Sequence, residues 1–306
     1  MVPSTEGAAT TASIAVIINP VSGTGGRIDV ARARAAKASA LLASRGADPS
    51  NVFITERAGH AREIALNAVA RGISVVAAWG GDGTMNEIGS ALAFRDAALS
   101  LVPSGSGNGL ARELGIPLDP DAALETALRG RERTIDAGEI DGRLFFNVAG
   151  VGLDARVAHA FAVNGLEKRG FTRYLRLTMR ELAAYRPDLL TVSTPAGSTC
   201  TPSLLVAIAN GRQYGNGAII APRAKLDDGR LDVVTVAARS LLRALLELPF
   251  VFAGMVDRVR GVRSETAESV GITSTYPIVY HLDGEPIAGT LKLSALVRPA
   301  ALRVRY

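Results

Sequence analysis

A glycine-rich turn between an apolar run and a helical stretch is the segment with the clearest chemical meaning. Val75–Glu87 reads VVAAWGGDGTMNE, so the apolar residues lead into Gly80–Thr84. Such a turn brings bare backbone N–H groups, and the positive end of a helix, against a phosphate. Asp82 within the turn would repel phosphate unless a cation lies between them or the carboxylate handles a proton. The segment therefore indicates a nucleotide bound together with a divalent metal ion.

Two more glycine-rich loops follow apolar runs. Ile14–Ile18 precedes NPVSGTGG, and Leu99–Val102 precedes PSGSGNG. One such loop would be weak evidence, since glycine often only marks a turn. Three loops after successive parallel strands would meet at one sheet edge, where open α/β folds bind ligands. The loops contain no lysine for a Walker A motif, and Leu110 replaces the third glycine of the dinucleotide fingerprint. Backbone amides and hydroxyl groups would then hold the phosphate: Ser22, Thr24, Thr84, Ser104 and Ser106.

In their order along the chain, the motifs resemble the diacylglycerol kinase catalytic family, which includes bacterial soluble lipid kinases and sphingosine kinases. The glycine turn alone would also fit NAD kinases or phosphofructokinases, but the ordered set covers nearly the whole chain from Ile14. The matching segments are Asn19-Pro20, Ser22-Gly23, Thr55 with Gly59-His60-Ala61, Gly80–Glu87, Gly105–Asn108, Asn147–Ala155, Leu226–Asp232 and Asp283–Pro286.

The resemblance implies an ATP-dependent kinase that uses Mg2+ and phosphorylates a lipid hydroxyl in lipid metabolism or phospholipid biosynthesis. Diacylglycerol, a sphingoid base, ceramide and other glycerolipids all remain open as substrates. One alternative is a soluble-substrate kinase of the NAD-kinase type, and another is a non-catalytic regulator that binds nucleotide or lipid. The resemblance assigns nucleotide binding to Asn19, Ser22, Gly23, Thr55, Gly80, Gly81, Asp82, Gly83, Thr84, Met85, Asn86, Gly105 and Ser106.

Three acidic residues are the catalytic candidates that the resemblance implies. Glu285 aligns with the general base, which takes the proton of the lipid hydroxyl. Asp283 is the second candidate for that role, and Asp82 would orient Mg2+ or the acceptor. Taken alone, Asp283-Gly284 between two apolar runs predicts a β-hairpin with an exposed Glu285. The two interpretations are compatible, because a hairpin tip can reach into a cleft.

The resemblance also suggests a structural metal loop and a substrate side. Asp228 would bind the metal through its carboxylate, and Lys225 and Arg230 through backbone carbonyls; the alternative is a plain Asp-Gly turn. Asn108, Asp136 and Asp154 are the candidates for contact with the substrate, with Asp154 at the polar head of the lipid or at a helix start. Gly109 stands where many bacterial diacylglycerol kinases have an acid, which weakens the case for diacylglycerol.

The pattern of elements predicts an α/β protein with two domains. Residues 14–134 alternate strand, turn and helix, as in a doubly wound α/β nucleotide-binding domain, with helices over 28–45, 60–71, 85–93, 110–114 and 120–129. Residues 135–306 predict a mostly antiparallel β-sandwich domain with helical insertions at 153–186 and 240–260, and a cleft between the domains. The strand at 301–306 could return to either domain, and residues 1–13 are expected to form a disordered tail.

Composition favours a cytoplasmic protein that associates peripherally with the inner face of the membrane. The chain has 306 residues, a net charge of +5 and a single cysteine, Cys200. No nucleic-acid module is recognisable, so anionic phospholipid headgroups are the expected partner of the basic charge.

A basic amphipathic helix over 167–186 could lie on them, with Arg169, Arg173, Arg176 and Arg180 on one face, or could be an ordinary surface helix. The apolar stretch 241–254 predicts a buried helix or, alternatively, a lip that touches lipid. A homodimer remains open.

Overall fold

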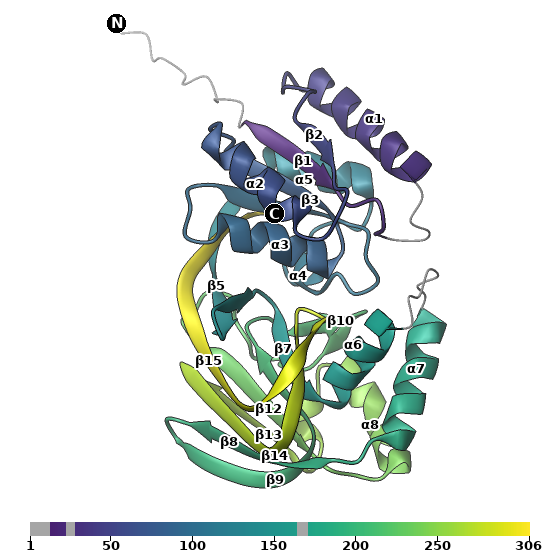
Figure 1. Cartoon of the computed structure of the whole chain (residues 1–306), viewed down its shortest axis with the longest axis vertical. Helices are drawn as coiled ribbons and strands as arrows, with labels where there is room; N and C mark the ends of the chain where they lie inside the picture. Colours follow the sequence, from purple (N-terminus) through teal and green to yellow (C-terminus); the bar gives the residue numbers. More distant parts are fainter. Residues whose placement is uncertain (1–12, 23–27, 164–170) are drawn as a thin grey trace, which may run out of the picture.

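The computed structural model describes residues 13–22, 28–163 and 171–306 (Figure 1). The expected tail, apart from Ser13, lies outside the described residues. The same holds for Gly23, for Arg169 and for the side chain of Arg173.

Four short parallel strands form the N-terminal part of the molecule, in the order β4-β3-β1-β2. They are β1 (Ile14–Ile18), β2 (Val52–Ile54), β3 (Val75–Gly80) and β4 (Ala98–Pro103). Every residue of β1, β3 and β4 is buried, which requires cover on both faces and explains why these strands are continuous apolar runs. The covering helices are α1 (Ile28–Ser44), α2 (His60–Ala70), α3 (Asp82–Leu92), α4 (Gly109–Glu113) and α5 (Pro120–Arg129).

The predicted helices of this part are present, with one difference that concerns the glycine turn. The helix expected from Met85 begins three residues earlier, at Asp82, because only Gly81 keeps an extended backbone after β3. Asp82, Gly83 and Thr84 therefore form the first turn of α3. The N-terminus of that helix, with its unpaired N–H groups, lies directly at the end of the strand.

The C-terminal part is mostly antiparallel and has its own apolar core (Figure 1). Its helices and its short 3₁₀ turn are α6 (Leu153–Val163), α7 (Phe171–Ala184), α8 (Leu241–Phe252) and η1 (Val256–Arg258). Its strands are β5 (Glu132–Ile140), β6 (Arg143–Phe145), β7 (Val148–Gly152), β8 (Asp188–Thr194), β9 (Gly197–Ala209), β10 (Gln213–Gly215), β11 (Ala218–Ile219), β12 (Leu231–Ala237), β13 (Val262–Ala267), β14 (Ser269–Leu282) and β15 (Glu285–Arg305).

The last strand, β15, joins the two parts (Figure 1). It begins against β14, continues against β5, and ends parallel to β4 with Arg303 opposite Ala98. The strand predicted at 301–306 is thus the last part of β15, and it returns to the N-terminal sheet. Just before this part, Ala300 adopts a positive φ of 51° where the register with β5 shifts. Because β5 and β15 both run across the junction, all described strands except β10 and β11 share one continuous sheet, and those two pair with each other.

The apolar stretch at 241–254 forms a helix as expected, but the expectation that this helix is buried is wrong. Its large apolar side chains are exposed, Leu242 and Leu246 each to 68%. The inward side of α8 carries Ala244, Glu247 and Val251 instead. Periodicity detects an apolar helix but cannot tell which of its faces meets the rest of the chain.

Candidate active site

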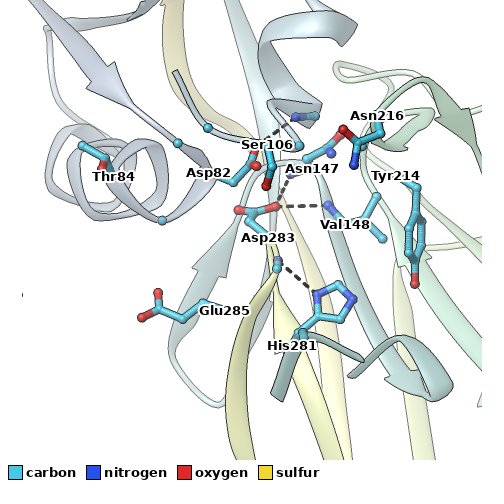
Figure 2. Close-up of a pocket in the computed structure, with 18 of the residues that line it drawn as sticks. Asp82, Thr84, Ser106, Asn147, Val148, Tyr214, Asn216, His281, Asp283 and Glu285 are labelled. Carbon is cyan, nitrogen blue, oxygen red and sulfur yellow. Dashed lines mark hydrogen bonds between the residues drawn. The ribbon is translucent and has the colours of Figure 1, made fainter. Parts of the chain in front are cut away.

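A cleft of about 630 Å3 lies between the glycine loops and the end of the β14–β15 hairpin (Figure 2). The predicted site residues that line it are Asn19, Ser22, Gly81, Asp82, Gly83, Thr84, Gly105, Ser106, Asp154, Asp283 and Glu285.

The three glycine loops meet at the carboxyl edge of the parallel sheet, as the sequence predicts. The Asn19 amide donates to the hydroxyl of Thr84 at 2.8 Å, which ties the first loop to the second. The hydroxyl groups of Ser22 and Ser104 lie 2.8 Å apart, which ties the first loop to the third. The polar side chains of the loops thus hold the loops together beside the cleft.

Close approach of two backbones explains the glycines at this edge. A Cβ atom on Gly105 would lie 2.6 Å from the Cα of Gly81, and one on Gly107 would lie 2.7 Å from Oδ2 of Asp82. Neither distance is tolerated by real side chains. None of these three glycines has a positive φ, so turn geometry alone does not require them. Gly81 and Gly107 leave their backbone amides bare at the cleft, which is the arrangement that phosphate binding uses, whereas the N–H of Gly105 donates to Oδ1 of Asn108 at 3.0 Å.

Asp82 holds the third loop against the helix that it begins. Its carboxylate accepts the N–H groups of Asn108 and Gly109, each at 2.9 Å. Burial raises the pKa of Asp82, the negative charge of Asp283 adds to the rise, and the two N–H donors oppose it. The side chain therefore has a structural task in addition to its place on the cleft wall.

The glycine that departs from the bacterial diacylglycerol kinase pattern has a packing reason in this chain. A Cβ atom on Gly109 would lie 2.3 Å from Nδ2 of Asn147. That amide nitrogen is fixed, because it donates to the carbonyl of Gln213 at 2.6 Å. No side chain, acidic or otherwise, fits at position 109 without displacing Asn147.

The predicted hairpin is present and Glu285 is exposed as expected, whereas Asp283, the first residue of the turn, is buried. Asp283 and Gly284 form a two-residue turn with positive φ values of 47° and 85°. The carboxylate of Asp283 accepts four donors: the N–H groups of Phe146 (2.9 Å), Asn147 (2.9 Å) and Val148 (3.1 Å), and the Asn86 amide (2.8 Å). Figure 2 shows Asn147 and Val148 beside this carboxylate. Burial raises the pKa of Asp283, and the four donors oppose that rise. This fourfold contact favours an anchoring role, and a direct catalytic role for Asp283 stays a prediction.

Glu285 is the exposed carboxylate of the cleft. It follows the anchored turn directly, and Figure 2 shows its side chain on the opposite side of the hairpin from His281. Its carboxylate forms no hydrogen bond within the described part of the chain. Partial burial raises its pKa, the negative charges of Glu87 and Asp283 contribute, and Arg143 opposes them. A carboxylate with a raised pKa and free lone pairs has the properties of a general base.

A buried group of polar side chains on the far side of the hairpin was not predicted. Nε2 of His281 lies 3.1 Å from Oδ2 of Asp154, and the Tyr214 hydroxyl donates to the same oxygen. The N–H of Gly284 donates to Nδ1 of His281 at 3.2 Å, so Nδ1 is the unprotonated nitrogen and Nε2–H donates to Asp154. One signal could have revealed His281: it lies two residues before Asp283 on a strand, hence on the same face. No comparable signal marks Tyr214.

Nine of the predicted site residues lie away from the cleft wall. Thr55 donates its N–H to Ile18, and Met85 is in the apolar core. Asn86 joins Asp283 to Leu144, and Asn108 bonds to both backbone groups of Gly105. The full set is Thr55, Gly80, Met85, Asn86, Asn108, Asp136, Lys225, Asp228 and Arg230.

Asp136, predicted to contact the substrate, instead accepts hydrogen bonds from two backbone N–H groups. Its buried carboxylate accepts the N–H of Gly229 at 2.7 Å and that of Ala300 at 2.8 Å. It thereby fixes the irregular point of β15 and the loop predicted to bind a metal. In that loop, Asp228 accepts the N–H of Arg230 at 3.1 Å, as in a plain Asp-Gly turn. The metal site at Lys225, Asp228 and Arg230 stays a prediction.

The charge of the cleft fits a nucleotide held together with a metal ion. Its wall carries the carboxylates of Asp82, Asp154, Asp283 and Glu285, and no lysine or arginine of the described chain. A polyphosphate in such a surrounding requires a cation between it and the carboxylates. Carboxylate and hydroxyl oxygens are the ligands that Mg2+ prefers. The residues present therefore fit both groups.

The fold and the cleft together define a kinase of the α/β class, with glycine loops on one wall and a carboxylate on the other. Residues 13–140 match the diacylglycerol kinase catalytic domain, and residues 147–306 match the YegS C-terminal NAD kinase beta sandwich-like domain. The chain belongs to the YegS-like lipid kinase family, which combines these two domains.

Relatives with curated names support this membership over most of the chain. The Pseudomonas aeruginosa protein named "Probable lipid kinase YegS-like" is 35% identical over 265 residues, which cover 83% of each chain. A Yersinia enterocolitica protein of the same name is 32% identical, over 78% of this chain and 81% of its own. A crystal structure of a diacylglycerol kinase from Bacillus anthracis has the same fold, with a TM-score of 0.69, 17% identity and 98% of each chain covered.

Proposed function

We propose that this protein is an ATP-dependent lipid kinase, with Mg2+ as cofactor, that transfers the γ-phosphate to a lipid hydroxyl while attached to the cytoplasmic face of the membrane. One observation carries the proposal: a hairpin turn anchored by Asp283 holds Glu285 in the cleft opposite the glycine loops. The lipid acceptor follows from the relatives, which are named probable lipid kinases and align over most of the chain.

The glycine loops form the nucleotide side of the proposed site. Backbone amides of Gly81 and Gly83 bind the phosphates, and Ser106 adds a hydroxyl donor at the same wall. Asp82 and the N-terminus of α3 position the loops through the contacts described above. When bound, Mg2+ supplies the positive charge that the cleft wall lacks.

The C-terminal part forms the acceptor side. Glu285 accepts the proton of the lipid hydroxyl as the oxygen attacks, and its raised pKa brings its basicity closer to neutral pH. Asp154 lines the same cleft beyond the hairpin from Glu285, and His281 and Tyr214 orient its carboxylate. In this proposal it accepts hydrogen bonds from the polar head of the lipid.

The test is transfer of radiolabelled phosphate from ATP to a panel of lipids in mixed micelles, with NAD as a soluble acceptor. The panel holds diacylglycerol, monoacylglycerol, sphingosine and ceramide. Wild type is compared with Glu285→Gln and with Glu268→Gln, a matched control at an exposed glutamate of the loop before β14. We expect label in one lipid class, lost in Glu285→Gln and retained in the control.

Two outcomes would contradict the proposal. Label in NAD would identify a kinase for a soluble substrate. Binding of ATP, measured by calorimetry, without transfer to any acceptor would indicate a regulator that binds nucleotide without using it.

A further inference from the structure

Helix α8 has the reverse of the usual arrangement for a surface helix. Six of its twelve residues are large apolar side chains with exposures from 37% to 68%: Leu242, Leu245, Leu246, Leu248, Phe250 and Phe252. Its acidic residue Glu247 faces inward and pairs with Arg239 and with Arg243, the other charged residue of the helix, whose side chain is exposed. A helix that covers the core of a soluble protein carries its apolar stripe inward. The outer face of α8 is therefore built to meet something apolar.

The exposure is concentrated on this helix. Fifteen large apolar side chains are exposed in the described part of the chain, and six of them lie on α8. The others are scattered over both parts of the molecule, as is normal for single exposed residues. A contiguous apolar patch of this kind marks an interaction surface.

Exposed arginines lie beside the apolar face. The Arg243 guanidinium donates to the carbonyl of Arg260 at 3.2 Å, which brings the segment after η1 next to the start of α8. Arg258 and Arg260 are exposed, and neither has an ion-pair partner within the described part of the chain. The one acid on α8, Glu247, is already neutralised by two arginines. The patch is thus apolar with a cationic edge.

Helix α8 also packs close to the acceptor side of the cleft. A Cβ atom on Gly254, just after the helix, would touch Ile219 at 3.4 Å, and the neighbouring Ala218 lines the cleft. Val251 on the inward side of α8 shares an apolar cluster with Tyr214, which also lines the cleft. Figure 1 shows α8 on the same side of the C-terminal part as α6 and α7. A surface that meets α8 is therefore close to the cleft.

We propose that the outer face of α8 docks into the headgroup region of an anionic lipid bilayer, with its apolar side chains among the acyl chains and Arg258 and Arg260 on lipid phosphates. Leucine and phenylalanine on one face, with arginine at its edge, are typical of helices that lie in the plane of a membrane interface. Anionic headgroups complement the cationic edge, and attraction to them adds to the apolar contact.

A second copy of this chain is the main competing occupant. In a symmetric dimer the same patch meets itself, so the arginines at the edge of one copy face those of the other. That juxtaposition leaves like charges together, whereas a bilayer supplies the opposite charge. The charge pattern thus favours lipid. The docking surface rests on the membrane attachment in the proposed function, but docking itself requires no phosphate transfer.

The test measures binding of the purified full-length protein to sedimented vesicles, without ATP or lipid substrate. The vesicles contain phosphatidylcholine alone or with 30% phosphatidylglycerol, a composition chosen for the assay at roughly the anionic content that such surfaces respond to. The variants are Leu242→Gln/Leu246→Gln and Arg258→Gln/Arg260→Gln. Leu118→Gln, at an exposed leucine of the N-terminal part, is the matched control. Glutamine keeps the helix propensity of leucine, so α8 remains formed.

We expect wild type and the control to bind the anionic vesicles, and the leucine variant to bind at least about ten-fold more weakly. The arginine variant should lose most of the preference for anionic over neutral vesicles, and its binding should depend less on salt. Equal binding of wild type and the leucine variant would overturn the proposal, as would no binding of wild type. Sedimentation equilibrium provides a second readout: a wild-type dimer that the leucine variant dissociates would identify a second copy as the occupant.

Discussion

Replacing Asp283 with asparagine tests whether the hairpin turn is an anchor or a reacting group. The substitution preserves size and removes one acceptor oxygen of a carboxylate that receives four donors. If the new NH2 group takes the place of Oδ2, the buried N–H of Phe146 and the amide of Asn86 both lose their acceptor.

The expected loss of stability follows from these two donors. Each buried donor without a partner costs about 1–3 kcal/mol, or about 2–6 kcal/mol for both. Burial raises the pKa of Asp283, which shows that the buried negative charge costs free energy. A neutral amide avoids this cost, so it offsets part of the loss. The net destabilisation should then be about 2–3 kcal/mol. For a chain of this size, that corresponds to a fall in Tm of roughly 5 °C.

The effect on activity should follow from displacement of the neighbouring residue. Glu285 comes two residues after Asp283 and is positioned by the turn, so a shift of the turn by a fraction of an ångström to about 1 Å should lower kcat by roughly 10- to 100-fold. Thermal unfolding and the phosphate-transfer assay measure the two effects on the same samples. Glu285→Gln is the comparison, since it should lower activity with an unchanged Tm because its carboxylate is exposed.

Two results would refute this reasoning. If Asp283→Asn abolishes transfer with an unchanged Tm, Asp283 takes part in the chemistry and the four hydrogen bonds do not anchor the turn. If it changes neither quantity, the turn is held by other contacts.

Three further predictions concern single contacts. Gly109→Asp should destabilise the protein by about 1–3 kcal/mol and lower its Tm, because the new Cβ atom would clash with Nδ2 of Asn147. An unchanged Tm would show that the side-chain amide of Asn147 moves aside without cost. Glu87→Gln removes a negative charge that raises the pKa of Glu285, so the pKa of Glu285 should fall. Because a general base acts when it is ionised, the acid limb of the pH profile of kcat/KM should then move to lower pH. A shift to higher pH would contradict the assignment of Glu285 as the base. If the 225–230 loop binds a metal, millimolar Mg2+ or Ca2+ should raise the Tm of wild type but not the Tm of Asp228→Asn. Equal increases in Tm for both proteins would place any stabilising ion elsewhere.

The edge of the parallel sheet could be predicted from the sequence because local signals suffice there. Each glycine loop follows a run that is apolar apart from Ser100, and apolar runs of this length between helices form parallel strands with both faces covered. Parallel strands end on the same side, so the loops of Asn19, Asp82 and Ser106 had to converge. The hairpin at Asp283-Gly284 was equally readable, since the dipeptide favours the positive φ values that such a turn requires.

The surroundings of these residues were decided by the tertiary structure. The hairpin pattern alone predicts the exposed Glu285 but not the burial of Asp283, which arises because three consecutive backbone N–H groups at 146–148 converge on its carboxylate. The pairing of Asp154 with His281 joins residues 127 positions apart, and no local pattern contains such a contact.

The same distinction explains the outcome for the last strand and for α8. Alternation in residues 285–305 predicts strands, but only pairing with both β4 and β5 makes them one strand that joins the two parts. The composition of α8 predicts a helix, whereas its orientation depends on the inward pairing of Glu247 with Arg239 and Arg243. Sequence by itself determined which elements form and which residues end them, because propensity and periodicity act over a few residues. Tertiary structure decided which faces are buried and which polar groups meet, because those outcomes depend on partners far away in the chain.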